Sequence, residues 1–160
     1  MEIKIGFKMK KLIFIIFLVF GNIANGFNNI VIIKENKQSQ VKILAIIAKN
    51  YGANFNLLLD DFNTLGYKTV ITGVTKKVAS CTWASGIGLP ELTVDSLISE
   101  IKDVKSYDAV VVMTSNWRNG NPYSDIIEDS LAMNLIITAL DNNIVLYLPC
   151  SAPIILCGLT

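Results

Sequence analysis

Short, mainly apolar runs alternate along the chain with segments in which apolar residues recur at every third or fourth position. Four runs are rich in β-branched residues and have the length of strands buried on both faces: residues 41–48, 67–72, 108–113 and 144–148. The first two runs flank a segment with helical spacing, formed by Phe55, Leu58, Leu59, Phe62 and Leu65. Asn54 is the expected N-cap of this helix, and Gly66 the residue that follows its end. The strand–helix–strand order predicts a right-handed crossover and a parallel sheet.

The pattern continues in the same way through the second half of the chain. After an irregular stretch, a short strand is expected at residues 76–81 and a short helix at residues 96–102. Asp95, just before that helix, is expected to fix a turn at a strand end. Asn121 and Pro122 open a long predicted helix, whose apolar side carries Ile126, Ile127, Leu131, Leu135 and Leu140. The fold class that follows is a three-layer α/β/α sandwich with a mostly parallel sheet.

The most informative stretch is the one around Cys150. The apolar run 144–148 stops abruptly at Pro149-Cys150-Ser151-Ala152-Pro153, and a second apolar run begins directly after Pro153. A proline suits the first turn of a helix, so Cys150 is expected on a tight strand-to-helix turn. This is the geometry of a nucleophile elbow, and a neighbouring helix N-terminus favours a thiolate. The alternative is an inert cysteine that fills the core, and the sequence leaves both interpretations open.

Three loops are expected to meet around this cysteine, because sites in doubly wound sheets form at the carboxyl ends of the strands. They are residues 49–54, 114–118 and 149–153. Ser115, Asn116 and the backbone at Ser151 are candidate oxyanion donors. The candidate pocket residues are Asn54, Trp117 and Arg118. Each of these also has an ordinary explanation, as a loop residue or an exposed Trp-Arg stack.

The segment around Cys150 resembles the elbow of the PfpI / DJ-1 superfamily, which has the class I glutamine-amidotransferase-like fold. The matching residues are Cys150, Pro153, Leu156, Gly158 and Leu159. Further stretches match in the same order: VKILAIIA from Val41, LGYKTVITG from Leu65, the pair Val94-Asp95, and YDAVVVM from Tyr107. The resemblance implies a flavodoxin-like sheet. It also implies a cysteine-dependent hydrolase, deglycase or glyoxalase type of enzyme that acts on a carbonyl or amide carbon through Cys150. A non-catalytic binding or redox-sensing domain on the same scaffold is the alternative.

Four departures from the family pattern bear on that choice. No carboxylate follows the first strand before Asp60, although the family usually places an acid there beside the cysteine. Thr114-Ser115-Asn116 replaces the family's Gly-Gly pair, and the chain contains no histidine to act as a general base. Family members continue past the elbow helix, whereas this sequence stops at Thr160. The domain of residues 41–160 is therefore expected to be incomplete at its C-terminus.

The N-terminal segment has the three-part pattern of a secretory signal peptide. Four lysines precede a wholly apolar run at residues 12–20, and the small residues Ala24 and Gly26 follow it. We expect residues 1–26 to be a signal peptide, residues 27–40 to be a lead or linker, and the protein to be secreted or extracytoplasmic. The alternative is an uncleaved N-terminal membrane anchor. Part of the high hydrophobic content, 52%, comes from this segment.

Charge and cysteine content narrow the remaining function classes. Cleavage after Gly26 removes four lysines and one glutamate, which changes the formal net charge from +1 to −2. With a single arginine and no basic cluster beyond Lys76-Lys77, we expect no nucleic-acid partner. A small-molecule carbonyl or peptide-like substrate is expected, with no cofactor and no metal, and a homodimer is left open. The three cysteines allow a Cys81–Cys157 disulfide beside a free Cys150 thiol, or three thiols.

Overall fold

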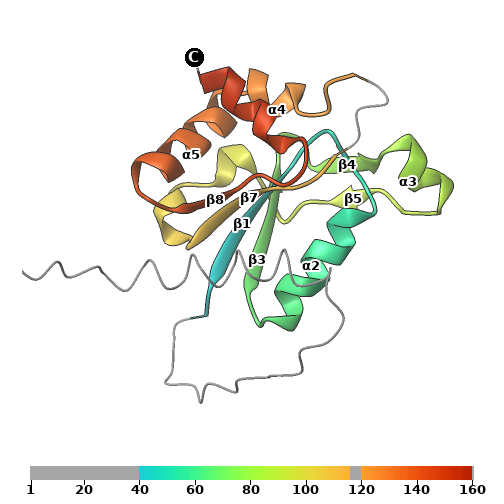
Figure 1. The fold of residues 1–160 in the computed structure, drawn as a ribbon, viewed down its shortest axis with the longest axis horizontal. Helices are drawn as coiled ribbons and strands as arrows, with labels where there is room; N and C mark the ends of the chain where they lie inside the picture. The colour runs from blue at the N-terminus through green and yellow to red at the C-terminus, as the bar shows by residue number, and fades with distance from the viewer. Residues whose placement is uncertain (1–39, 116–119, 160) are drawn as a thin grey trace, which may run out of the picture. The chain divides into compact units, whose positions relative to one another are not determined.

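The computed structural model describes residues 40–115 and 120–159 (Figure 1). The predicted signal peptide and almost all of the predicted lead lie outside the described residues. So do the candidate site residues Asn116, Trp117 and Arg118. Within the described ranges, no helix has both the length and the apolar character needed to cross a membrane.

A five-stranded parallel sheet forms the centre of the described fold. Its order is β6-β3-β1-β7-β8, and each neighbouring pair is parallel. The strands are β1 (Lys42–Ile47), β3 (Lys68–Gly73), β6 (Ser96–Leu97), β7 (Ala109–Val112) and β8 (Val145–Tyr147). The four apolar runs predicted as parallel strands are therefore confirmed. β1 lies in the middle, which explains why it is apolar and buried from Ile43 to Ile47, after the exposed Lys42.

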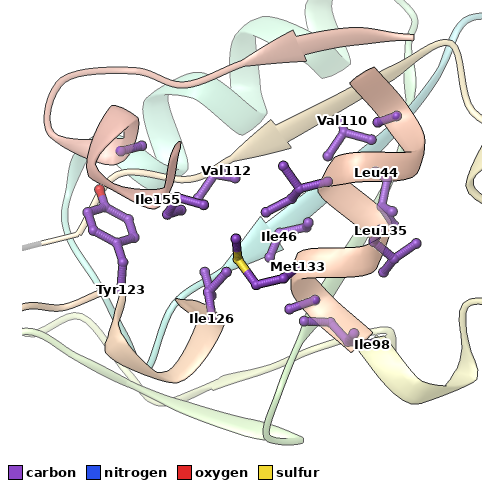
Figure 2. Close-up of a cluster of buried hydrophobic side chains, with 14 of the residues drawn as sticks. Leu44, Ile46, Ile98, Val110, Val112, Tyr123, Ile126, Met133, Leu135 and Ile155 are labelled. Carbon is purple, nitrogen blue, oxygen red and sulfur yellow. The ribbon is translucent and has the colours of Figure 1, made fainter. Parts of the chain in front are cut away.

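Alternate residues of the central strands point to two different apolar layers. Leu44 and Ile46 of β1 face one buried cluster, which includes the inner side of α5 (Ser130–Asp141). Figure 2 shows this cluster. Ile43 and Ile47 face the opposite cluster, which includes Phe55 of α2 (Asn54–Thr64). Helices cover both faces of the sheet, as Figure 1 shows, and the predicted three-layer α/β/α architecture is confirmed.

A small second sheet lies beyond the end of β1. It consists of β2 (Asn50–Tyr51), β4 (Lys77–Ser80) and β5 (Leu92–Thr93), with β2 and β4 parallel and β4 and β5 antiparallel. The Tyr51 ring packs edge-on against Phe55 at 5.3 Å between centroids, and its hydroxyl donates to the Pro90 carbonyl. Cys81 follows β4 and is the N-cap of α3 (Thr82–Gly86). The short strand predicted at residues 76–81 is thus confirmed.

The short helix predicted at residues 96–102 is wrong in its first part. Residues 96–97 form strand β6, and two 3-10 turns follow, η2 (Ile98–Glu100) and η3 (Val104–Ser106). The Asp95 carboxylate accepts the backbone N–H of Ile71 at 2.8 Å, which holds this segment against the edge of β3. Asp95 therefore fixes a turn at a strand end, as predicted.

The long helix predicted after Pro122 is two helices. α4 (Ser124–Glu128) and α5 are separated by Asp129, whose backbone is extended. The Asp129 side chain accepts the backbone N–H of Ala132 at 2.8 Å and so caps α5. The break changes the helical phase, and Leu131 and Leu140 are 50% and 43% exposed instead of buried. The inner side of α5 is formed by Ala132, Met133, Leu135, Ile136 and Ala139.

The predicted ends of α2 are half right. Gly66 follows the helix with a left-handed φ of +71°, as expected for a glycine at this place. The predicted N-cap is wrong, because Ala53 occupies that position with helical backbone angles and Asn54 is the first residue of the helix. The Phe55 amide already donates to the Gly52 carbonyl at 3.0 Å, so the chain turns before Asn54.

Candidate functional site

Cys150 occupies a sharp turn between β8 and the 3-10 helix η5 (Ala152–Leu159). Its thiol side chain is exposed, and its φ of +55° lies in the left-handed region that residues with a β-carbon rarely adopt. The Ala152 amide donates to the Pro149 carbonyl at 3.0 Å, which closes the turn directly over Cys150. The alternative interpretation of Cys150 as buried core filling is therefore wrong.

The elements that flank Cys150 differ from prediction in two respects. β8 ends the sheet and its three residues are only half-buried, so it is not a strand enclosed on both faces. The segment after it is a 3-10 helix that begins at Ala152, one residue before Pro153. Ile155 anchors this helix in the core, while Leu156 and Cys157 are exposed. The Cys81–Cys157 disulfide does not form, because Cys81 is a buried thiol beside α3 and Cys157 an exposed one.

A buried tyrosine lies under the turn. Tyr123 precedes α4, is 0% exposed, and belongs to the same apolar cluster as Ile126 and Ile155. It lies at the edge of that cluster, with its hydroxyl oxygen at the outer end of the ring (Figure 2). The hydroxyl accepts the Ser115 backbone N–H at 3.2 Å and lies 3.4 Å from the Ser151 hydroxyl oxygen.

The Tyr123 hydroxyl is protonated at neutral pH, as in an ordinary tyrosine, and burial reinforces this state. Desolvation raises the pKa of Tyr123, the hydrogen bonds with Ser151 and Ser115 oppose the rise, and the electrostatic effect of Cys150 adds to it. A phenolate is also unfavourable close to a second negative charge, because the two charges repel each other. Tyr123 is accordingly a neutral hydrogen-bonding group at neutral pH.

Ser115 connects the same site to the end of β1. Its hydroxyl donates to the Asn50 carbonyl oxygen at 2.7 Å and also contacts the Asn50 side-chain oxygen. Asn50, Ser115, Tyr123 and Ser151 therefore form one chain of contacts, which we call the hydroxyl network. It joins the start of β2 to the described parts of the segments that follow β7 and β8, so these parts of the three predicted loops lie together.

The predicted site residues have different positions relative to this network. Ser115 and Ser151 belong to it, and Cys150 directly precedes Ser151. The Ser115 amide, predicted as an oxyanion donor, already donates to Tyr123. Asn54 is exposed on the first turn of α2, and no hydrogen bond among the described residues joins it to the network.

The sequence analysis missed a second polar group near the end of β1. One oxygen of the Asp125 carboxyl is buried and has no hydrogen-bond partner among the described residues. Burial raises the pKa of Asp125, while the backbone amides of Lys49 and Ile126 and the charge of Lys49 oppose that rise. The Lys49 ammonium donates to the Ser124 hydroxyl at 3.0 Å. The available signal was the position of Asp125 shortly after a strand-end loop, in a segment that the sequence analysis treated only as the start of a long helix.

Two further observations delimit the site. The described residues contain no cluster of three or more histidine, cysteine, aspartate or glutamate side chains with metal-binding geometry. A hollow of about 220 Å³ lies between η2–η3 and α5. Its lining includes Ile98, Val104 and Leu135, and none of its lining residues belongs to the hydroxyl network.

The fold and the exposed cysteine define a class of protein. It is a three-layer α/β domain with a flavodoxin-like parallel sheet, in which a cysteine with left-handed backbone conformation follows an edge strand. Solved structures of the DJ-1/ThiJ/PfpI type share this fold. The DJ-1/ThiJ/PfpI-like and ferritin-like two-domain protein of Anabaena variabilis aligns with a TM-score of 0.61 at 15% identity, over 74% of this chain and 32% of that one. A DJ-1 superfamily protein of Agrobacterium tumefaciens aligns with a TM-score of 0.50 at 17% identity, over 67% of this chain and 52% of that one.

A candidate protease I of Bacteroides thetaiotaomicron aligns with a TM-score of 0.50 at 16% identity, over 66% of this chain and 61% of that one. The predicted resemblance is thus confirmed at the level of the fold. This chain spans between about one third and about three fifths of the lengths of these three structures. No protein-family model and no curated protein matches the sequence.

Proposed function

We propose that this chain is an exported, cysteine-dependent enzyme of the hydrolase, deglycase or glyoxalase type. Cys150 is its nucleophile, and the substrate is a small carbonyl compound or a peptide-like amide. The observation that carries the proposal is the combination of an exposed thiol and a left-handed backbone at Cys150. Strained backbone at a strand-to-helix turn is how α/β enzymes present a nucleophile above the sheet.

The chemical step follows from the groups around the turn. The Cys150 sulfur adds to the carbonyl carbon, a carbon–sulfur bond forms, and the π electrons move to the carbonyl oxygen. With an amide or ester, collapse of this adduct expels the amine or alcohol, and water then hydrolyses the thioester. Within the given residues, which contain no histidine, the thiol proton passes to solvent.

A second candidate function is redox sensing on the same scaffold. The observation that favours it is an exposed thiol in a left-handed turn, together with a first-strand loop that has no carboxylate before Asp60, where the family usually places an acid beside the cysteine. An exposed thiol in a polar turn is oxidised in steps through a sulfenic to a sulfinic acid. In this case Cys150 reacts with peroxide but transforms no carbonyl substrate.

The test compares two exposed cysteines of one segment, Cys150 and Cys157. We expect iodoacetamide at pH 7 to label Cys150 about tenfold faster than Cys157 when labelling is followed site by site by mass spectrometry. Cys150→Ser should lower turnover of methylglyoxal and of 4-nitrophenyl acetate by at least about a hundredfold. Cys157→Ser is the matched control and should retain activity.

Either of two results would reject the enzyme proposal. One is wild-type activity in Cys150→Ser, and the other is a wild-type chain without Cys150-dependent turnover of either probe. Oxidation of Cys150 by hydrogen peroxide in that second case would favour the sensing function.

A further inference from the structure

We propose that the hollow between η2–η3 and α5 is a second ligand site, which takes a small uncharged molecule with a branched aliphatic group and one amide or hydroxyl group. None of the residues that line the hollow belongs to the hydroxyl network. Figure 2 shows Ile98 and Leu135, which line the hollow, at the opposite end of the buried cluster from Tyr123. The inference therefore goes beyond the proposed function and does not depend on it.

One wall of the hollow is a single side of α5. Its lining residues have the spacing i, i+3, i+4, i+7, which places them in one row along a helix: Leu131, Asn134, Leu135 and Thr138. Leu135 is 9% exposed and belongs to the core, whereas Leu131 is 50% exposed. This wall is therefore apolar both in its deep part and at its mouth.

The other wall consists of the two 3-10 turns and the residues between them. Ile98 and Val104 line it and are only 3% and 2% exposed. A regular helix, as expected here from sequence, would present a continuous row of side chains to α5, whereas 3-10 helices occur in short pieces. Ile101 has extended backbone and separates η2 from η3. The hollow lies where this wall is interrupted.

Hydrogen bonds hold this second wall in a fixed shape. The Glu100 carboxylate accepts the Leu97 amide at 2.7 Å, and the Asp103 carboxylate accepts the Lys105 amide at 2.9 Å. The Ser106 hydroxyl donates to the Asp103 carbonyl at 2.8 Å. A hollow with walls capped in this way is formed before a ligand arrives, so little conformational entropy is lost on binding.

The charge of the lining favours an uncharged ligand. The charged lining residues, Lys102 and Asp103, are consecutive, exposed and of opposite sign, so the lining has no net charge. The deep part of the hollow is formed by apolar side chains of the core. An ionic group placed against them has no counter-charge and loses its hydration, which is costly.

Uncharged polar side chains of α5 match the polar group of the ligand. Asn134 and Thr138 can both donate and accept hydrogen bonds, as an amide or hydroxyl group requires. The volume of about 220 Å³ holds about seven groups of the size of a water molecule, at about 30 Å³ each. A branched aliphatic chain with one amide group has this size.

The first experiment compares three probes with the same branched chain and different charge. They are isovaleramide, which is neutral, isovalerate, which is negative, and isopentylamine, which is positive at pH 7. Each is titrated into the full chain labelled with ¹⁵N, and binding is followed by the amide signals of Ser99 and Asn134 in NMR spectra. We expect saturable shifts with isovaleramide and a Kd of about 1 mM. Each ion should bind at least about fivefold more weakly.

The second experiment uses a matched pair of leucines on α5. Leu131→Gln replaces the apolar side chain at the mouth and should raise the Kd for isovaleramide about fivefold. Leu140 is 43% exposed on the same helix but does not line the hollow, and Leu140→Gln should change this Kd by less than about twofold. Both positions are exposed, so the core remains intact. Thr138→Val keeps the shape of the side chain without its hydroxyl and should raise the Kd about threefold.

Each part of the inference has its own contrary result. No saturable shift with any probe up to about 20 mM would overturn the site. An ion that binds as tightly as isovaleramide would overturn the ligand class. An unchanged Kd in Leu131→Gln would show that binding occurs outside the hollow. Cys150→Ser should bind isovaleramide with the wild-type Kd, so the failure of the proposed function and the failure of this inference are distinguishable.

Discussion

At the scale of single residues, the backbone of Cys150 is the feature with the clearest energetic meaning. A left-handed conformation costs a residue with a β-carbon about 1–2 kcal/mol. Asn143 has the same φ of 55°, but asparagine is among the residues that tolerate it. Cysteine has no such compensation, and glycine would avoid the cost entirely. The side chain at position 150 is therefore present at the expense of stability, which is common at functional sites.

This cost can be measured directly. Cys150→Gly should be more stable than Cys150→Ala by about 1 kcal/mol, because both variants lack the thiol and only alanine keeps the left-handed strain. Urea unfolding followed by circular dichroism gives the difference between the two free energies of unfolding. If alanine is as stable as glycine, the turn at Cys150 is not left-handed in solution.

Sequence could identify Cys150 but not the tyrosine beneath it. The thiol is flanked by a β-branched run and by Pro153, and both signals are local. Tyr123 carries no local signal, because its hydroxyl contacts Ser115 and Ser151, which lie 8 and 28 positions away. The pattern of apolar residues could therefore predict the turn but not the network that supports it.

At the scale of elements, the break between α4 and α5 shows how one polar side chain overrides periodicity. Apolar residues recur at helical spacing from residue 126 to residue 140, which suggests one helix. Asp129 interrupts it, because its carboxylate satisfies the Ala132 amide at the start of a new helix. An aspartate followed by helix-forming residues is an N-cap signal, but inside a periodic segment it resembles any exposed acid.

The cap has a measurable contribution to stability. Asp129→Ala should lower the free energy of unfolding by about 1 kcal/mol, because it leaves the Ala132 amide without its partner. Asn134→Ala changes an exposed polar residue on the same helix and should stay within about 0.5 kcal/mol of the wild type. Equal effects from the two substitutions in urea titrations would show that Asp129 does not act as a cap.

At the scale of the whole molecule, the sheet could be predicted because each buried strand is marked by its own residues. The βαβ unit fixes the handedness of the crossover, so parallel pairing of β1 and β3 follows from the first half of the domain. The half-buried state of β8 does not follow in this way. It depends on β8 being the edge of the sheet, and strand order is not encoded in any one strand.

Export is a property of the whole chain and has its own test. We expect the full-length protein, produced in a bacterium with an active secretory pathway, to be recovered outside the cytosol with an N-terminus near Phe27. Phe17→Arg interrupts the apolar run and should retain the protein in the cytosol with Met1 or Glu2 at its end. Mass spectrometry of both preparations decides the question. An exported protein that keeps residues 1–26 would instead identify the N-terminal anchor.

The members of the hydroxyl network are synthesised in the order in which they occur in the chain. Its members occur in the chain as Asn50, Ser115, Tyr123 and Ser151, so the thiol-bearing turn leaves the ribosome after the segments that receive it. The last member, Ser151, can join the network only when the cysteine turn itself is present, so a chain that ends before this turn would leave Tyr123 without that contact.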